Sequence, residues 1–279
     1  MNVNKTKMPL QAKIKMTSRP ENFLSRYHRQ IIIPEIHSKG QKRLFSAHVG
    51  IIGCGGLGAS VIPYLVAAGV GSVGLYDEDK IDLSNLNRQI LFTPNDLQNY
   101  KVNKVEEWIK AFSPQTKVKT HHYKILPHNI LQELQQYDLI IDCVDTMHTK
   151  YLINDGCMKL QKPFIHSSCV GFLGQVLAVP DAKSPCFRCL FEVIPPACEL
   201  ENCKTAGILG ATCGIVGSMA ALEAIKMIAS PQNASRGRFL SFNFFDSSTK
   251  AFDFEKNPEC PACGQFPTIE PTCQADYLS

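Results

Sequence analysis

The chain has 279 residues, of which 44% are hydrophobic and 19% are charged, a globular composition that fits one sizeable α/β domain. The formal net charge of +4 is too small to indicate nucleic-acid binding, and no apolar run approaches the roughly 18 residues needed to span a bilayer. We therefore expect neither a nucleic-acid nor a membrane partner. Twelve cysteines without an export signal predict metal or redox chemistry in a reducing cytosol, so we expect a cytoplasmic protein.

The first 47 residues divide into a basic leader and an arm. Residues 1–20 contain several Lys, no acidic residue and no apolar signal-peptide core, so we predict a disordered leader followed by a single folded domain over 21–279. Residues 21–47 are helical in pattern, with Arg29 and its basic neighbours in front of an apolar run over 31–33. From these residues alone, we interpret the arm as a solvated basic face beside a packed anchor.

A strand–turn–helix–strand unit follows, and the chain is organised around it. An apolar strand over 49–52 leads into a G-x-G-x-x-G turn, a helix over 59–68 and a strand over 72–76, which ends at Asp77. Glycines allow a tight turn and a close approach of the backbone to phosphate, and the helix start offers N–H groups to the anion. An acidic residue at the position of Asp77 accepts ribose hydroxyls. The glycines of the turn are Gly53, Gly55, Gly56 and Gly58.

The segment after Asp77 distinguishes a triphosphate from a nicotinamide cofactor. Arg88 ends the sequence DLSNLNR, and Lys101 follows thirteen residues later. Charge-assisted contacts from Arg and Lys hold phosphate strongly, and a nicotinamide cofactor does not need them at this position. The segment therefore favours a nucleoside triphosphate over the alternative of an oxidoreductase.

The remaining elements alternate between strands and helices, which predicts a doubly wound, largely parallel sheet of Rossmann type. In such a sheet the carboxyl ends of the strands face the ligand. A buried strand over 137–145 ends at Asp145, which is placed either to hold Mg²⁺ beside the phosphates or to cap the following helix. The other predicted elements are helices over 96–111, 130–136, 150–160 and 214–229, strands over 116–123, 163–170 and 175–179, and a terminal hairpin over 239–254.

Two C-x-x-C motifs predict a structural zinc site that pins the C-terminal tail to the domain. Four thiolates complete the tetrahedral shell of zinc without an open position, and a redox C-x-x-C is the alternative. Cys203, next to Lys204 in a polar stretch, is either a nucleophile or an inert loop thiol. The motif cysteines are Cys186, Cys189, Cys260 and Cys263. Five others lie in apolar elements and are expected in the core, namely Cys54, Cys143, Cys157, Cys169 and Cys213.

Several motifs in one order resemble the ThiF/MoeB/HesA branch of the ubiquitin-activating-enzyme superfamily over about 21–265. They are RYHRQ, GCGGLG, DEDKIDLSNLNRQILF, DCVD, CFRCLF, NCKTAGILG, ALEAIK and CPACG. The resemblance implies an enzyme that uses ATP and Mg²⁺ to adenylate the C-terminal glycine of a ubiquitin-like sulfur carrier protein, with release of pyrophosphate. The sequence looks more like ThiF, of thiamine biosynthesis with a ThiS-like carrier, than like MoeB, of molybdopterin biosynthesis with a MoaD-like carrier. A non-catalytic partner of the same superfamily is a further hypothesis.

The resemblance also implies roles for residues around the nucleotide. The glycine turn would line the nucleotide, and Asp77 would hold the ribose. Arg88 and Lys101 would stabilise charge on the transferring and leaving groups, and Asp145 would bind Mg²⁺. Further nucleotide contacts are expected at Asp79, Ser84, Asn85, Leu86, Asn87 and Thr146.

Other implied roles involve partners and metal. Arg29 would reach the nucleotide from the other subunit of a homodimer. Cys203 matches a thiol that links covalently to the carrier in some members, and the four motif cysteines match the zinc ligands. Persulfide sulfur is expected from another protein. The chain departs from the family pattern at Thr146, where Asn is usual, at Lys150, where Arg is usual, and at Ala211, which replaces a common Pro.

Overall fold

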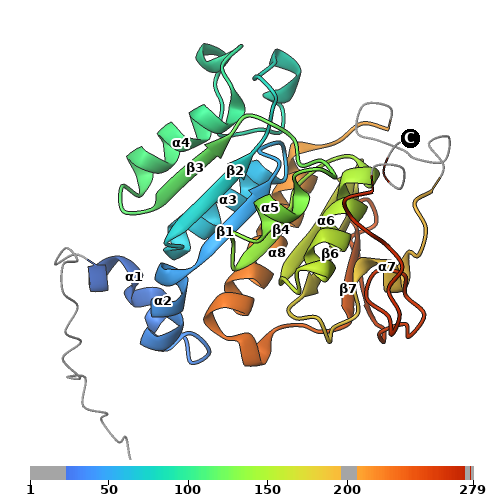
Figure 1. The fold of residues 1–279 in the computed structure, drawn as a ribbon. Helices are drawn as coiled ribbons and strands as arrows, with labels where there is room; N and C mark the ends of the chain where they lie inside the picture. Colours follow the sequence, from blue (N-terminus) through green and yellow to red (C-terminus); the bar gives the residue numbers. More distant parts are fainter. Residues whose placement is uncertain (1–22, 196–205, 274–276, 278–279) are drawn as a thin grey trace, which may run out of the picture.

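The structure is a computed structural model that describes residues 23–195, 206–273 and 277 (Figure 1). The predicted leader over 1–20, and Cys198 and Cys203, lie outside the described residues. One central sheet carries helices on both faces, which confirms the predicted α/β class (Figure 1).

The strands of the described residues are β1 His48–Ile52, β2 Ser72–Tyr76, β3 Lys117–His121, β4 Leu139–Asp142, β5 Phe164–Val170, β6 Leu173–Val179, β7 Arg238–Asn243 and β8 Ser248–Asp253. They form one sheet in the order β3-β2-β1-β4-β5-β6-β7-β8. The first five are parallel, whereas β6, β7 and β8 run antiparallel to their neighbours. The Rossmann-type order is therefore confirmed for the first half of the sheet, and the predicted terminal hairpin is β7 with β8.

The described α-helices are α1 Phe23–Ile31, α2 His37–Ser46, α3 Gly58–Ala68, α4 Lys101–Phe112, α5 Ile130–Leu134, α6 Met147–Lys159, α7 Phe187–Leu190 and α8 Gly210–Ala229. Because side chains of a strand alternate between the faces of a sheet, each face has its own core. Ile51 of β1 packs with residues of α2, α3, α4 and α8, whereas the adjacent Ile52 packs with residues of α5, α6 and α7. The glycine turn begins directly after Ile52, at the carboxyl edge shared by both faces.

Helix α8 corrects the expectation that no apolar run approaches membrane-spanning length. Its 20 residues are long and apolar enough to cross a membrane by length and composition alone. In the fold it is a core helix, because it packs against α3 on one side and against β5 and β6 on the other. Val216 and Ala220 on this helix are completely buried. Burial on two sides accounts for its apolar sequence.

Element boundaries differ from the sequence prediction at two places that matter for the site. Helix α4 begins at Lys101 rather than at 96, because Pro94–Asp96 forms a separate 3₁₀ turn. Strand β4 ends at Asp142, so Asp145 lies in the loop that follows it. Thr146 occupies the N-cap position of α6, and the alternative that Asp145 caps this helix is wrong.

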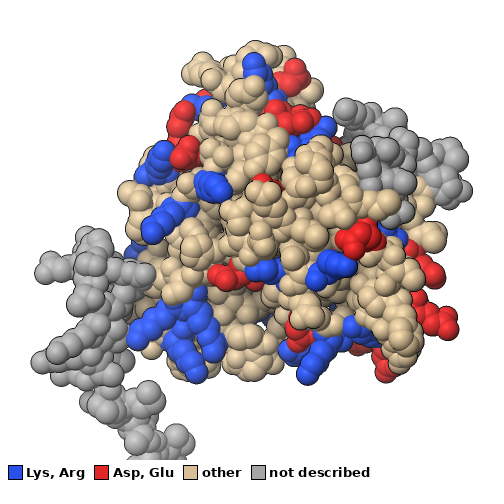
Figure 2. Space-filling view, in the orientation of Figure 1, with Lys and Arg blue, Asp and Glu red and all other residues tan. Residues whose placement is uncertain are grey.

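The N-terminal arm folds as α1 and α2, and its anchor differs from the prediction. Ile32 and Ile33, which were expected to be packed, are 54% and 40% exposed. Tyr27 is the buried anchor instead, and its ring lies edge-on to Phe45 with centroids 5.0 Å apart. Arg29 is exposed, as a solvated basic face requires. Figure 2 shows Lys and Arg side chains gathered over α2, whose sequence contains no acidic residue.

Candidate active site

The glycine turn places unpaired backbone donors at the start of α3. Gly53 has a φ of 101°, a left-handed conformation that favours glycine, and its N–H donates to the carbonyl of Tyr76 at 2.8 Å. Among the described residues, no protein atom accepts a hydrogen bond from the N–H groups of Gly55 or Gly56. Unpaired N–H groups at a helix start form an anion site, because they point toward the ligand and the helix dipole adds positive potential. The turn can therefore hold phosphate.

Asp77, at the carboxyl edge of the sheet, also fixes the position of this turn. One of its carboxylate oxygens accepts the N–H of Cys54 at 2.8 Å, and the other accepts the N–H of Asp79 at 2.9 Å. Burial raises the pKa of Asp77, and the nearby ammonium group of Lys101 opposes that rise. Asp77 therefore ties the end of β2 to the glycine turn, a structural role that sequence reasoning did not assign to it.

Lys101 meets both acidic residues from the start of α4. Its Nζ lies 2.7 Å from the carboxylate of Asp79 and 3.9 Å from that of Asp77. The Lys101 side chain is 6% exposed, whereas that of Asp79 is 61% exposed. The structure thus brings together three of the residues predicted for the nucleotide. Because Asp79 is solvated, its contact with Lys101 can be exchanged for a contact with a stronger anion.

Arg88 approaches the glycine turn from the segment that follows β2. Its Nη1 donates to the carbonyl of Ser84 and to Oδ1 of Asn87, both at 2.9 Å. A Cβ added to Gly56 would lie 3.5 Å from Cδ of Arg88, which places the arginine stem directly beside the turn. A capping box between Asp82 and Asn85 shapes this segment. The resulting edge presents cationic side chains and backbone donors, a combination that can bind a polyphosphate and stabilise charge on it.

Asp145 and Thr146 follow the end of β4, the strand next to β1, and both are exposed. The hydroxyl of Thr146 donates to that of Thr149 at 2.8 Å, so this side chain is occupied locally. The structure therefore places Asp145 on the predicted carboxyl edge of the sheet, where an exposed carboxylate is open to a cation.

Sequence reasoning missed a buried charge network at the end of β4, next to the loop that carries Asp145. Nζ of Lys150 lies 3.2 Å from both carboxylate oxygens of Asp142 and donates to the carbonyl of Ser167 at 2.6 Å. Nδ1 of His166 lies 3.0 Å from the same carboxylate. Burial raises the pKa of Asp142, but Lys150 and His166 outweigh it and leave that pKa below its usual range. The only sign of this network in the sequence was Lys150, which stands at a position where the family usually has Arg.

Arg29 is not brought to this site by its own chain. The neighbouring Gln30 donates to the carbonyl of Ala68, at the last turn of α3, whereas the glycine turn precedes the first turn. A helix of 11 residues is about 16 Å long. Any contact between Arg29 and the nucleotide site would therefore need a second subunit.

The two C-x-x-C motifs meet, as predicted. Their four Sγ atoms all lie within 4.8 Å of one another, with 3.7 Å between Cys186 and Cys260 and 3.3 Å between Cys189 and Cys263. A tetrahedral ion with metal–sulfur bonds of about 2.3 Å requires sulfurs about 3.8 Å apart. The donor set and its spacing fit zinc, and the short contacts join the two motifs to each other.

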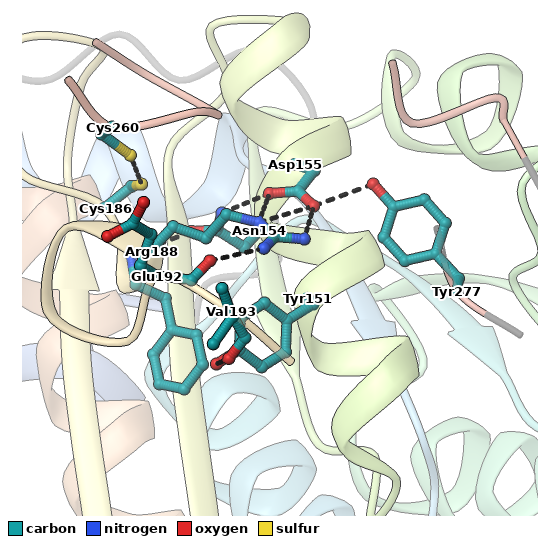
Figure 3. A network of polar contacts seen from close by, with 10 residues as sticks. Tyr151, Asn154, Asp155, Cys186, Arg188, Glu192, Val193, Cys260 and Tyr277 are labelled. Atoms are coloured by element: carbon teal, nitrogen blue, oxygen red, sulfur yellow. Dashed lines mark hydrogen bonds and ion pairs between the residues drawn. The ribbon is translucent and has the colours of Figure 1, made fainter. Parts of the chain in front are cut away.

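A second buried network, which the sequence did not reveal, ties this cysteine cluster to α6 (Figure 3). Arg188, which lies between Cys186 and Cys189 in the sequence, forms a bidentate ion pair with Asp155 at 2.8–3.0 Å. The hydroxyl of Tyr277 donates to the same carboxylate at 2.8 Å. Burial raises the pKa of Asp155, and Arg188 opposes that rise. The Arg188 guanidinium also lies over the ring of Tyr151, so helix, cluster and tail share one anchor.

The fold and the phosphate-binding edge together define a nucleotide-binding α/β protein of Rossmann type. The chain belongs to the ThiF family, whose family model matches residues 27–262. It is 37% identical over 250 residues to the sulfur carrier protein adenylyltransferase of Thermus thermophilus, covering 88% of this chain and 92% of that protein. It is 38% identical over 247 residues to adenylyltransferase and sulfurtransferase MOCS3 of Anopheles gambiae, covering 88% of this chain but only 56% of the relative.

Solved structures support the fold. E. coli MccB, crystallised with MccA, matches with a TM-score of 0.77 and 20% identity over 88% of this chain and 75% of MccB. PaaA matches with a TM-score of 0.73 and 21% identity over 88% of this chain and 78% of PaaA. At this level of identity, the likeness extends to the fold alone.

Proposed function

We propose that this chain is a sulfur carrier protein adenylyltransferase. It transfers AMP from ATP to the C-terminal glycine carboxylate of a ubiquitin-like sulfur carrier that ends in Gly-Gly, with release of pyrophosphate. The observation that carries the proposal is the position of Arg88 beside Gly56 of the glycine turn, together with that of Lys101 beside Asp77, whose carboxylate holds the same turn. Membership of the ThiF family and the name of the Thermus thermophilus relative support it.

The reaction is a substitution at the α-phosphorus. A carboxylate oxygen of the carrier forms a bond to that phosphorus while the bond to the pyrophosphate oxygen breaks. The chain contributes position and charge rather than a covalent intermediate at this step. The amides of the turn hold phosphate oxygens, Arg88 neutralises the transferring phosphoryl group, and Asp77 both holds the turn and receives the ribose.

Lys101 would change its partner during the reaction. It lies against Asp79 in the structure, and its ammonium group would move from this solvated carboxylate to the departing pyrophosphate. Asp145 would hold Mg²⁺, which supplies further neutralisation of phosphate charge. The buried ion pair between Asp142 and Lys150 supports the loop that carries Asp145.

The proposal also includes a structural zinc ion and a second subunit. Zinc held by the four motif cysteines would stabilise the C-terminal region, and the closed four-thiolate set leaves it no catalytic position. A homodimer would bring Arg29 of one subunit to the nucleotide of the other. The exposed Ile32 and Ile33, beside that arginine, support an apolar contact between subunits.

The carrier is proposed to be ThiS-like, which assigns the chain to thiamine biosynthesis, with a MoaD-like carrier of molybdopterin biosynthesis as the second candidate. The MOCS3 relatives are named sulfurtransferases as well, and this chain spans just over half of their length. Cys203→Ala is expected to leave adenylation unchanged and to block sulfur loading of the carrier; unchanged loading would show that Cys203 has no role in that step.

The direct test is ATP–pyrophosphate exchange with zinc-loaded protein and either a ThiS-like or a MoaD-like carrier, each ending in Gly-Gly. Exchange that depends on one carrier supports adenylation and identifies the pathway. Absence of exchange with both, together with absence of ATP binding, would favour the hypothesis of a non-catalytic superfamily partner.

A further inference from the structure

Two thiols lie together beside the glycine turn, apart from the motif cysteines. Cys169 is near the end of β5, and Cys213 is in the first turn of α8. Their Sγ atoms are 3.7 Å apart, although the residues are 44 positions apart in the chain. Cys213 is 2% exposed, and Cys169 is half-buried. Sequence reasoning placed both in the core, which is confirmed for Cys213 and holds only in part for Cys169.

The pair is in contact with the residues proposed to bind the nucleotide. A Cβ added to Gly56 would lie 2.7 Å from Sγ of Cys213, so this sulfur fills the space that the glycine leaves. Gly210, at the start of the same helix, packs so closely that a Cβ there would lie 2.5 Å from the carbonyl oxygen of Asn87. The first turn of α8 therefore supports the glycine turn and the backbone next to Arg88.

Cys213 differs from the other thiols near the turn. The contact with Cys169 and the charge of Arg88 hold the pKa of Cys213 below its usual range, although burial opposes them. By contrast, burial raises the pKa of Cys54 and that of Cys143. Because the thiolate is the reactive form of cysteine, Cys213 is the thiol at this edge that is prepared to attack an oxidised neighbour.

We propose that Cys169 and Cys213 form a reversible oxidation site, at which a peroxide converts the pair to a disulfide and weakens nucleotide binding. The effect on binding rests on the proposed function. Hydrogen peroxide oxidises the more accessible Cys169 thiol to sulfenic acid and is itself reduced to water. The Cys213 sulfur then attacks the Cys169 sulfur, the S–O bond breaks, and hydroxide leaves with the Cys213 proton as a second water.

We expect the disulfide to change the packing around the turn. A disulfide needs its sulfurs about 2.05 Å apart, so the two sulfurs must approach by more than an ångström from their present 3.7 Å. We expect Cys213 to supply part of this approach, so that its sulfur moves away from Gly56 or the first turn of α8 moves away from Asn87. Either movement removes packing that fixes the phosphate-binding backbone. Reduction by a dithiol restores the original contacts.

The test uses the full-length, zinc-loaded protein treated with hydrogen peroxide. Non-reducing peptide mapping detects a Cys169–Cys213 crosslink, a chromogenic chelator reports zinc release, and titration calorimetry gives the affinity for Mg-ATP. We expect the crosslink and a loss of ATP affinity of about tenfold or more, both reversed by dithiothreitol. Cys169→Ser and Cys213→Ala should keep their affinity after peroxide treatment. Cys273→Ser, which removes an exposed thiol elsewhere, should respond like the unmodified chain.

Two results would overturn the proposal. One is peroxide treatment that yields no Cys169–Cys213 crosslink, for example because only the motif cysteines react and zinc is released. The other is a crosslink that forms while ATP affinity stays unchanged. If the reduced protein does not bind ATP at all, the proposed function fails instead, and peptide mapping alone decides whether the oxidation site exists.

Discussion

Charged side chains are held in different ways in two regions of the molecule. The nucleotide edge is the glycine turn with Arg88 and Lys101, and the cysteine face is the cluster of motif cysteines with Asp155 and Arg188. At the nucleotide edge, Lys101 contacts Asp79, whose side chain is 61% exposed, and Arg88 is held by a carbonyl and an amide oxygen. On the cysteine face, Asp155 and Arg188 are 2% and 5% exposed and form a bidentate pair. A contact with a solvated carboxylate can be exchanged for one with a ligand, whereas a broken buried pair leaves an uncompensated charge. One region is therefore arranged to receive a ligand, and the other to remain fixed.

The largest expected effect follows from breaking the fixed region. Asp155→Ala leaves the Arg188 guanidinium buried without its partner, and we expect a loss of about 3–5 kcal/mol in the free energy of unfolding. Chemical denaturation measures it. The matched control is Asp253→Ala, which removes an exposed partner of Arg238 and should cost at most about 1 kcal/mol. Equal losses in the two variants would contradict the distinction between the regions.

At the nucleotide edge, Arg88→Ala should reduce activity without reducing stability. We expect adenylation to fall by about 10²–10³-fold, as on removal of one charge-stabilising donor, with an unchanged melting temperature. ATP–pyrophosphate exchange and thermal unfolding measure the two effects. Arg236→Ala, which removes an exposed arginine elsewhere, should leave exchange unchanged. A near-normal rate in Arg88→Ala would remove this residue from the mechanism.

A pH effect separates the buried network below Asp145 from the exposed edge. Burial lowers the pKa of His166, so the folded chain keeps this ring neutral while the unfolded chain binds a proton below its ordinary pKa of about 6.5. Stability should therefore fall as the pH drops from 7 to 5, by up to about 1.4 kcal/mol per pH unit from this group. The lowered pKa of Asp142 acts only at more acidic pH, because its stabilisation is lost below the usual carboxyl range.

His166→Asn should flatten that fall, and denaturation curves at several pH values measure it. His128→Asn, which changes an exposed histidine, is the control and should retain the slope of the unmodified chain. Identical slopes in all three proteins would show that His166 is not the group responsible.

The smallest expected effect concerns the tail. Tyr277→Phe removes the hydroxyl that donates to Asp155, and we expect a loss of about 1 kcal/mol, typical of one hydrogen bond, with ATP–pyrophosphate exchange unchanged. Tyr64→Phe, at a tyrosine that is 55% exposed, should have no measurable effect on stability. A change in exchange without a change in stability would connect the tail to the reaction instead.

The same contrast explains what the sequence could predict. The glycine turn, Asp77, Arg88 and Lys101 were identifiable because local order and residue type imply phosphate binding, and the structure brings them together. The partners of Lys150 and Arg188 could not be identified from the sequence. Each ion pair joins two separate elements, and nothing in the sequence distinguishes the paired acidic residue from other acidic residues. Arg188 and Tyr277 are far apart in the sequence, and they meet at Asp155 of α6 only in the folded chain.

Element boundaries and the arm were predicted less well for related reasons. The start of α4 is set by Tyr100 and the preceding 3₁₀ turn, which a helical pattern over 96–111 does not reveal. The exposure of Ile32 and Ile33 contradicts a packed anchor because Tyr27 occupies the buried position instead. The role of Arg29 depends on a second subunit, which one chain cannot supply.

Adenylation of a carrier at this edge of the sheet can be measured as the intact mass of a Gly-Gly carrier after incubation with the enzyme, Mg-ATP and inorganic pyrophosphatase. We expect a carrier whose mass increases by one AMP group, no increase with Arg88→Ala enzyme, and no increase when the terminal glycine is removed. A carrier that stays unmodified while the enzyme binds ATP, tested with both ThiS-like and MoaD-like proteins, would contradict this expectation.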